Sequence, residues 1–240
     1  MAGLIDADIV AYRCAAASEG DPVEVALLRT ETMTMGILDK EPYYKMFLTG
    51  SRNNYPHTEK LNFRNLVNQQ YKANRTKPAP IHLDACRKYL IETYGAIVCE
   101  GFEADDGCGM NQDAESVIYT IDKDLLQIPG CHYNFVTGAY REVSEVDGYR
   151  MFYKQMLIGD TSDNIFGIPL IGKVKAAKLI DHLETEEEMY DVVHTIYMDE
   201  KYNKNPEQTD GHTRFIMNAD CLWIWRKEGE KFSDRPRKIY

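Results

Sequence analysis

Three short apolar segments of this chain each lead into acidic residues, and this arrangement limits the possible folds more than any other feature. The first segment ends at Asp6, the one at 96–99 is followed by Glu103, and the one at 116–121 is followed by Asp122. Stretches with a helical pattern follow the first two of them, at 8–18 and 104–110. Strands that alternate with helices predict a mostly parallel sheet, whose ligands bind at the carboxyl ends of the strands. We therefore expect these acids to meet at one edge of an α/β sheet.

The remaining pattern divides the chain into two regions. Helices are expected at 8–18, 22–38, 82–94 and 104–110, then at 146–157, 173–183, 186–196 and 213–225, with further strands at 44–48, 133–136 and 141–143. This predicts an α/β core at 1–145 and a helical region at 146–240. A polar segment at about 50–80 is poor in aliphatic residues, so we expect it to stand off the core.

The bulk composition limits the ligands that the protein can bind and the compartment in which it is expected. The formal charge is −10, which argues against nucleic-acid binding by bulk electrostatics. Eight of the 38 acids are interpreted below as metal ligands, which leaves 30 acids against 28 basic residues, and basic strips at 52–77 and 173–178 remain available for phosphate groups. Six cysteines without a CxxC pair predict reduced, mostly buried thiols, and six histidines lack zinc-site spacing. Without a membrane-length apolar run or a signal peptide, a cytoplasmic protein without membrane contact is expected.

Four short acidic segments carry the candidate chemistry. They read IDAD at 5–8, EADD at 103–106, DKD at 122–124 and GDTSDN at 159–164. Mg²⁺ prefers carboxylate oxygens, and a centre with two ions needs several of them from different segments. Asp and Asn also cap helices and form turns, so each segment alone has a structural explanation. The three acids of 103–106 repel one another without a cation, which favours a shared metal site.

The order of these motifs resembles the flap endonuclease family, which includes bacteriophage 5′→3′ exonucleases and the 5′-nuclease domain of bacterial DNA polymerase I. The motifs IDxD, EADD, DKDLLQ and GDTSDNIFGIPLIG carry the resemblance between residues 4 and 177. It implies a PIN-like sheet flanked by helices, a helical arch within 50–80 and a C-terminal helix–hairpin–helix (H3TH) region at about 159–183. It also implies a 5′→3′ exonuclease and structure-specific 5′ flap endonuclease, acting by a two-metal mechanism with Mg²⁺ or Mn²⁺. The expected partner is DNA with 5′ ends or flaps, and the expected setting is phage replication or recombination, in the host cytoplasm if a phage encodes the protein.

The resemblance also implies two metal clusters. Carried over by position, the first cluster would contain Asp6, Glu103, Asp105 and Asp106, and the second Asp122, Asp124, Asp160 and Asp163. Asp8 has no firm counterpart, and we expect it to cap a helix. The family usually has an acid directly after the second strand, where this chain reads FLTG at 47–50. We expect water to replace that ligand, with Glu59 as the alternative.

The sequences NFR at 62–64 and YKANR at 71–75 resemble the family signature at the base of the arch. The resemblance implies that Lys72 and Arg75 are catalytic and contact the scissile phosphate, with Arg64 and Tyr71 also on the DNA. Lys suits this role as a point charge and Arg as a fork of donors. The alternatives are a solvated polar loop and, for Tyr71, a core tyrosine.

The sequence GIPLIG at 167–172, followed by lysines, resembles a helix–hairpin–helix element. Glycines allow tight turns close to a phosphate, and the next helix offers free N–H groups. We expect Gly167, Gly172, Lys173 and Lys175 to bind the DNA backbone without sequence preference. The resemblance also implies a K⁺ ion here, although Leu170 replaces the usual glycine. The alternative is a helix–turn–helix corner with exposed lysines.

Three other functions compete with this interpretation. In a haloacid-dehalogenase-type phosphatase, Asp6 would be the nucleophile, but 71–75 and 103–106 would have no role. A non-catalytic helix–hairpin–helix DNA-binding protein would keep all its activity after metal removal. A PIN-type ribonuclease would share the acidic core without the arch or the hairpin. The nuclease is expected to be a monomer.

Overall fold

A mostly parallel six-stranded sheet forms the centre of the α/β core in this computed structural model, which describes residues 1–51, 55–199, 201 and 210–235. Its strands are β1 (Ala2–Asp6), β2 (Tyr44–Thr49), β3 (Ile97–Cys99), β4 (Ser116–Tyr119), β5 (Gly130–Asn134) and β6 (Ala139–Val143). They lie in the order β3-β2-β1-β4-β5-β6, and only β6 is antiparallel to its neighbour. The predicted sheet is therefore confirmed, and β1 lies between β2 and β4 at its middle.

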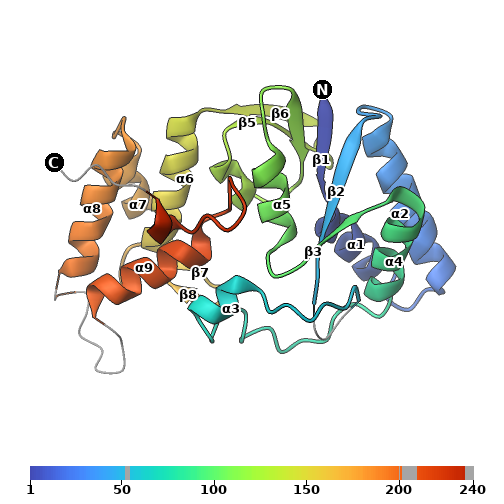
Figure 1. Cartoon of the computed structure of the whole chain (residues 1–240), viewed down its shortest axis with the longest axis horizontal. Helices are drawn as coiled ribbons and strands as arrows, with labels where there is room; N and C mark the ends of the chain where they lie inside the picture. Colours follow the sequence, from blue (N-terminus) through green and yellow to red (C-terminus); the bar gives the residue numbers. More distant parts are fainter. Residues whose placement is uncertain (52–54, 200, 202–209, 236–240) are drawn as a thin grey trace.

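Helices cover both faces of the sheet because successive strand residues point to opposite sides. Ile5 packs into the cluster formed with α1 (Ala7–Ala16), α2 (Val23–Leu38) and α4 (Leu83–Tyr94). Its neighbour Leu4 packs on the other face against α5 (Ala104–Asn111). Figure 1 shows α1, α2 and α4 together on one side of the sheet, with α5 on the other. This layering sends the first turns of α1 and α5 to the same edge.

The C-terminal helices form a separate hydrophobic cluster. They are α6 (Glu145–Ile158), α7 (Lys173–Ile180), α8 (Glu186–Met198) and α9 (Gly211–Leu222). Short elements join them to the rest: η1 (Asp124–Gln127), β7 (Gly159–Asp160), β8 (Ile165–Phe166) and η3 (Phe232–Asp234). Trp223 and Trp225 are buried, as expected of core residues. Figure 1 shows this helical layer beside α5, away from α1 and α2.

The polar segment contradicts one expectation. Its helix α3 (Phe63–Val67) buries Phe63, whose ring stacks on Trp225 with centroids 4.5 Å apart. Tyr71 is also buried in the C-terminal cluster. The prediction that 50–80 stands off the core is therefore wrong for 63–71, because two aromatic rings were enough to dock a segment poor in aliphatic residues. Residues 52–54, which include part of the expected basic strip, lie outside the described residues.

The cysteines agree with the expectation from composition, whereas one strand begins earlier than expected. All six cysteines are free and five are buried, as predicted. Strand β5 begins three residues before the expected 133, because Cys131 pairs in register with Val117 of β4. Tertiary pairing here overrides the turn-like glycine at its start. Within the described residues, no helix combines the length and apolar character needed to cross a membrane.

Candidate active site

The first acidic group lies at the carboxyl ends of β1 and β4. Asp6 ends β1 and caps α1, and it is 1% exposed. Its Oδ1 accepts the Ile9 N–H at 3.4 Å and its Oδ2 accepts the Thr120 hydroxyl at 3.1 Å. Burial, with the charges of Asp8 and Asp122, raises its pKa to about 8. A carboxylate in this position needs a proton or a nearby cation to offset its charge.

Asp105 belongs to the same group from the first turn of α5. Burial raises its pKa well above the usual value, and the charges of Asp6, Asp122 and Glu103 raise it further. Acids from three separate segments are therefore close enough to repel one another. Thr120 was missed by the sequence reasoning, because a hydroxyl after a strand carries no signal of its own.

Glu103 faces the base of the polar segment. Its Oε1 lies 2.5 Å from Lys72 Nζ and accepts the Asn62 side-chain amide at 2.9 Å. Its Oε2 lies 3.2 Å from the hydroxyl of Tyr71. Burial would raise its pKa, but the charges of Lys72 and Arg64 lower it to about 2. Glu103 is therefore ionised and neutralised by the protein's own cations.

Asp163 meets the same segment from the loop between β7 and β8. Its Oδ2 accepts the Tyr71 hydroxyl at 2.7 Å, and its Oδ1 lies 2.6 Å from an Arg75 guanidinium nitrogen. Lys72 Nζ lies 3.7 Å from Oδ2. The structure thus brings together residues of two separate motifs, with Tyr71, Lys72 and Arg75 from 71–75 and Asp163 from 159–164.

Asp160 and Asp124 lie beside this loop. Asp160 Oδ1 accepts the backbone N–H and the hydroxyl of Ser162 at 2.8 and 2.7 Å. Burial raises the pKa of Asp124 to about 7, together with the charges of Asp122 and Asp160. The Oδ1 atom of Asp124 is buried without a hydrogen-bond partner, and Lys123 Nζ lies 4.0 Å away from it. A buried acceptor of this kind needs a partner, which a cation would supply.

The chemical type of these donors suits a hard divalent cation. All of them are carboxylates, several raise each other's pKa, and the buried Oδ1 of Asp124 accepts no hydrogen bond from the described residues. Among the described residues, however, no three Asp, Glu, His or Cys side chains are arranged to hold an ion as they stand. Glu103 and Asp163 are instead directed at Lys72, Tyr71 and Arg75.

Two assignments are contradicted by burial. Asp106, predicted as a metal ligand, is 0% exposed, and both its oxygens accept hydrogen bonds from Arg64. They also accept the backbone N–H groups of Glu103 and Trp225. Arg64, predicted to bind DNA, is 3% exposed and donates further to the carbonyls of Cys221 and Trp223. Neither side chain is available to a ligand, because each is saturated within the core.

Tyr71 requires a related correction. Its ring is 4% exposed, so it cannot stack on a base as expected for the DNA-binding role. The alternative of a core tyrosine describes its ring, while its hydroxyl reaches Glu103 and Asp163.

Asp8 is not the helix cap that we expected, since Asp6 takes that place. Its Oδ2 accepts the Thr49 N–H at 3.0 Å, and its Oδ1 pairs with Arg87. The carboxylate therefore lies at the end of β2, where the family acid is missing from the sequence. Glu59, the alternative source, is exposed, unlike the buried acids of the group. Arg87 gave no signal in the sequence, because it stands within an ordinary amphipathic helix.

The turn before α7 places the predicted hairpin residues at the surface. A Cβ on Gly167 would lie 2.3 Å from the Ile158 carbonyl carbon, so only glycine fits. Leu170 adopts φ 64, the left-handed conformation that favours glycine, and is 89% exposed. The turn is thus formed despite the substitution.

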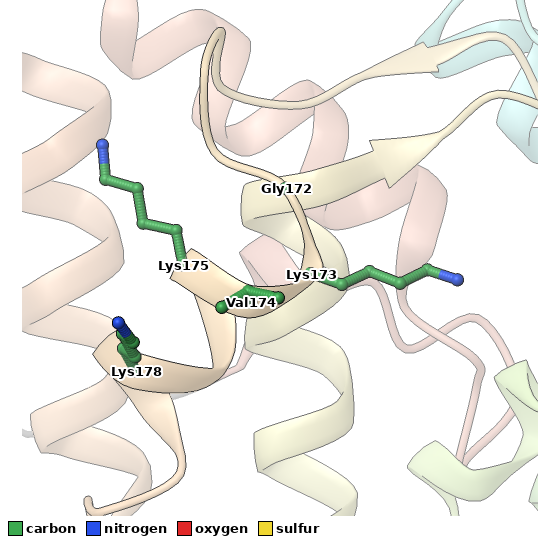
Figure 2. A pocket seen from close by; sticks show the side chains of 5 residues that line it. All are labelled: Gly172, Lys173, Val174, Lys175 and Lys178. Atoms are coloured by element: carbon green, nitrogen blue, oxygen red, sulfur yellow. The ribbon is translucent and has the colours of Figure 1, made fainter.

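Gly172 caps α7 and borders a shallow surface pocket that is also lined by Lys173, Val174, Lys175 and Lys178. In Figure 2, Lys175 and Lys178 point to one side of the helix and Lys173 to the other. The positive charge therefore flanks the turn rather than forming a single patch.

No family model matches the chain, but individual proteins do. DNA polymerase I of Caldicellulosiruptor bescii is 32% identical over 148 residues, which cover 51% of this chain and 17% of that protein. The 5'-3' exonuclease of Bacillus subtilis is 32% identical over 146 residues, covering 51% of this chain and 49% of that protein. The corresponding protein of Mycoplasma genitalium is 29% identical over 158 residues, covering 55% and 54%. The matches thus span about half the length of the exonucleases and less of the polymerase.

Solved structures extend the likeness to nearly the whole chain. A bacteriophage T5 flap endonuclease in complex with DNA and metal ions has a TM-score of 0.60 at 14% identity, covering 92% of this chain and 89% of that one. The T5 5'-exonuclease with bound zinc has a TM-score of 0.58 at 14% identity, covering 93% and 98%. The chain has the fold of these T5 nuclease structures. Within this fold, Asp6, Glu103 and Asp122 lie at or after the carboxyl ends of the parallel strands β1, β3 and β4.

Proposed function

We propose that the chain is a divalent-metal-dependent nuclease that hydrolyses DNA phosphodiester bonds, as a 5′→3′ exonuclease and a structure-specific 5′ flap endonuclease. One observation carries the proposal: acids from four separate segments lie close enough to raise one another's pKa or to share the same cations, and two of them, Glu103 and Asp163, pair with Lys72 and Arg75. Relatives named 5'-3' exonuclease and the T5 complex with DNA support the same substrate class.

Seven carboxylates are proposed to hold two ions of Mg²⁺ or Mn²⁺. They are Asp6, Glu103, Asp105, Asp122, Asp124, Asp160 and Asp163. When bound, such ions lower the pKa of a water and stabilise charge on the phosphate. Lys72 and Arg75 are proposed to bind the scissile phosphate, Lys72 as a point charge and Arg75 through its planar fork.

The turn before α7 is proposed to hold the duplex part of the substrate. Its exposed lysines and the free N–H groups of α7 suit phosphates, which are the same in every sequence. A K⁺ ion at the backbone of this turn is part of the proposal, supported by the left-handed conformation of Leu170. We propose that the protein acts as a monomer in the cytoplasm, that of the host if a phage encodes it.

The buried position of Asp6 argues against the phosphatase alternative. Both its oxygens accept hydrogen bonds, and the side chain is 1% exposed. A nucleophilic carboxylate needs an oxygen that is open to attack on the substrate.

The decisive experiment is cleavage of a 5′-labelled forked DNA. With Mg²⁺ we expect short 5′ fragments, whose lengths separate exonuclease from flap endonuclease action, and no products with EDTA. Asp105→Asn and Asp122→Asn should abolish cleavage while DNA binding, measured by mobility shift, is retained. Lys72→Ala should slow cleavage by orders of magnitude. Binding that persists with no cleavage under any metal would identify the non-catalytic alternative.

A further inference from the structure

The segment 70–75 is attached to the loop 160–164 by contacts that do not depend on charge. The Lys72 N–H donates to the Asp163 carbonyl at 2.9 Å, and the Asn74 amide donates to the Thr161 carbonyl at 2.6 Å. In the opposite direction, the Asn164 amide donates to the Gln70 carbonyl at 2.8 Å. The segment therefore has a defined docked position against the loop.

In this docked position the cations of the segment are directed at the candidate metal ligands. Lys72 Nζ lies 2.5 Å from Glu103 and 3.7 Å from Asp163, and Arg75 lies 2.6 Å from Asp163. The ammonium group therefore lies between two acids and neutralises both of them.

A divalent cation and Lys72 compete for the carboxylate oxygens of Glu103 and Asp163. The metal withdraws negative charge from the carboxylates, and the two cations repel each other at close range. When two ligands weaken each other's binding, the effect is reciprocal. Docking of the segment should therefore weaken metal binding, and metal binding should weaken docking by the same factor.

We propose that segment 70–75 is a latch that occupies the acidic site until a divalent metal displaces Lys72 and Arg75, which frees both residues for the substrate phosphate. The inference rests on the proposed function for the roles of metal and phosphate. Lys72 adopts φ 58, a left-handed conformation that is unfavourable for lysine, so the ion pairs and the hydrogen bonds together hold the segment against this strain, and loss of the ion pairs weakens docking. The latch couples the availability of the phosphate-binding residues to the presence of the metal.

Titration calorimetry with Mn²⁺ alone, on the full chain after removal of metals with EDTA, tests the latch without DNA. Lys72→Met keeps the length of the side chain and removes its charge, so Mn²⁺ should bind about tenfold more tightly than to the unaltered chain. Arg75→Met should tighten binding less, because Arg75 is more than half exposed. Lys77→Met is the matched control, since Lys77 is exposed and forms no ion pair with the residues described, and it should leave the affinity unchanged. Equal or weaker affinity for Lys72→Met would overturn the latch.

Limited trypsin digestion provides a second measurement on the unaltered chain. Release should expose the peptide bond after Lys72, so Mn²⁺ should accelerate cleavage there, as identified by mass spectrometry. Slower or unchanged cleavage would contradict release of the segment. Because neither measurement uses DNA, the latch can fail while the nuclease proposal stands, and absence of DNA cleavage would not by itself alter the Mn²⁺ affinities.

Discussion

Arg64 and Asp106 form a two-pronged ion pair that is almost completely excluded from water. The guanidinium nitrogens lie 2.6 and 2.9 Å from the two carboxylate oxygens, and the side chains are 3% and 0% exposed. Asp106 also accepts the N–H groups of Glu103 and Trp225. The pair therefore connects the base of the polar segment and the first turn of α5 to residues 221–225, which follow α9 or end it.

Removing one partner of this pair should be costly. Arg64→Met leaves the Asp106 charge buried without its cation, which destabilises a protein by about 3–5 kcal/mol. The double variant Arg64→Met with Asp106→Leu should recover a large part of that loss, because no charge is stranded. Urea denaturation measures both, with Arg75→Met as a control expected to change the stability by less than about 1 kcal/mol. A loss below about 1 kcal/mol for Arg64→Met would show that the pair is open to solvent.

Without metal, the stability of the protein should fall as the pH rises from about 5 to above 8. The folded state holds protons on Asp6 and Asp124, whose pKa values are raised to about 8 and about 7, whereas the unfolded chain releases them near pH 4. The unfolded state therefore binds fewer protons in this window, and stability declines until the folded groups also ionise. Glu103, with its pKa lowered to about 2, contributes only below about pH 4.5, where its stabilisation is lost as the pH falls.

Thermal melting in EDTA across this pH range measures the decline in stability. The free energy of unfolding should fall by about 1.4 kcal/mol for each unit by which a group's pKa is higher in the folded than in the unfolded state. Asp124→Asn should flatten the part of the curve near pH 7, and added Mg²⁺ should restore stability at pH 8. A melting temperature that rises steadily between pH 5 and 8 would contradict the raised pKa values.

Two glycines of the turn before α7 should respond differently to alanine. A Cβ on Gly167 would lie 2.3 Å from the carbonyl carbon of Ile158, whereas one on Gly172 meets nothing within 4 Å. Gly167→Ala should force the backbone apart and lower the melting temperature by several degrees. Gly172→Ala should melt near the unaltered chain, so any loss of DNA affinity in that variant reports contact at the turn. Equal melting temperatures for the two variants would show that Gly167 does not lie close against the Ile158 carbonyl group.

Asp8 should contribute negative charge to the first metal position, although sequence reasoning assigned it a capping role. Its carboxylate lies at the Thr49 N–H and raises the pKa of Asp6. Asp8→Asn should therefore weaken Mn²⁺ binding several-fold, and Arg87→Met, which removes the cation paired with Asp8, should strengthen it. Calorimetry with Mn²⁺ distinguishes this from a water in place of the missing acid, for which Asp8→Asn would leave the affinity unchanged.

The sequence was sufficient for the order of the elements and for the region of the site. Short apolar runs predicted β1 and β4, a helical stretch predicted α5, and chain order then placed Asp6, Asp105 and Asp122 at one sheet edge. These inferences succeed because the periodicity of apolar residues and the parallel arrangement of strands are local or topological properties.

The partner of each charged side chain was decided only by the tertiary structure. EADD at 103–106 presents three similar acids, yet Asp106 is bound to a buried arginine while Glu103 faces Lys72 and Asp105 faces Asp6. Adjacent residues on a helix point about 100° apart, so a shared motif does not give them a shared environment. Sequence by itself therefore determined that acids gather at the carboxyl edge of this sheet. Only the packing of segment 63–75 against α5 and the C-terminal helices decided which of them remain open to a metal, because a buried charge must take its partner from whatever segment packs beside it.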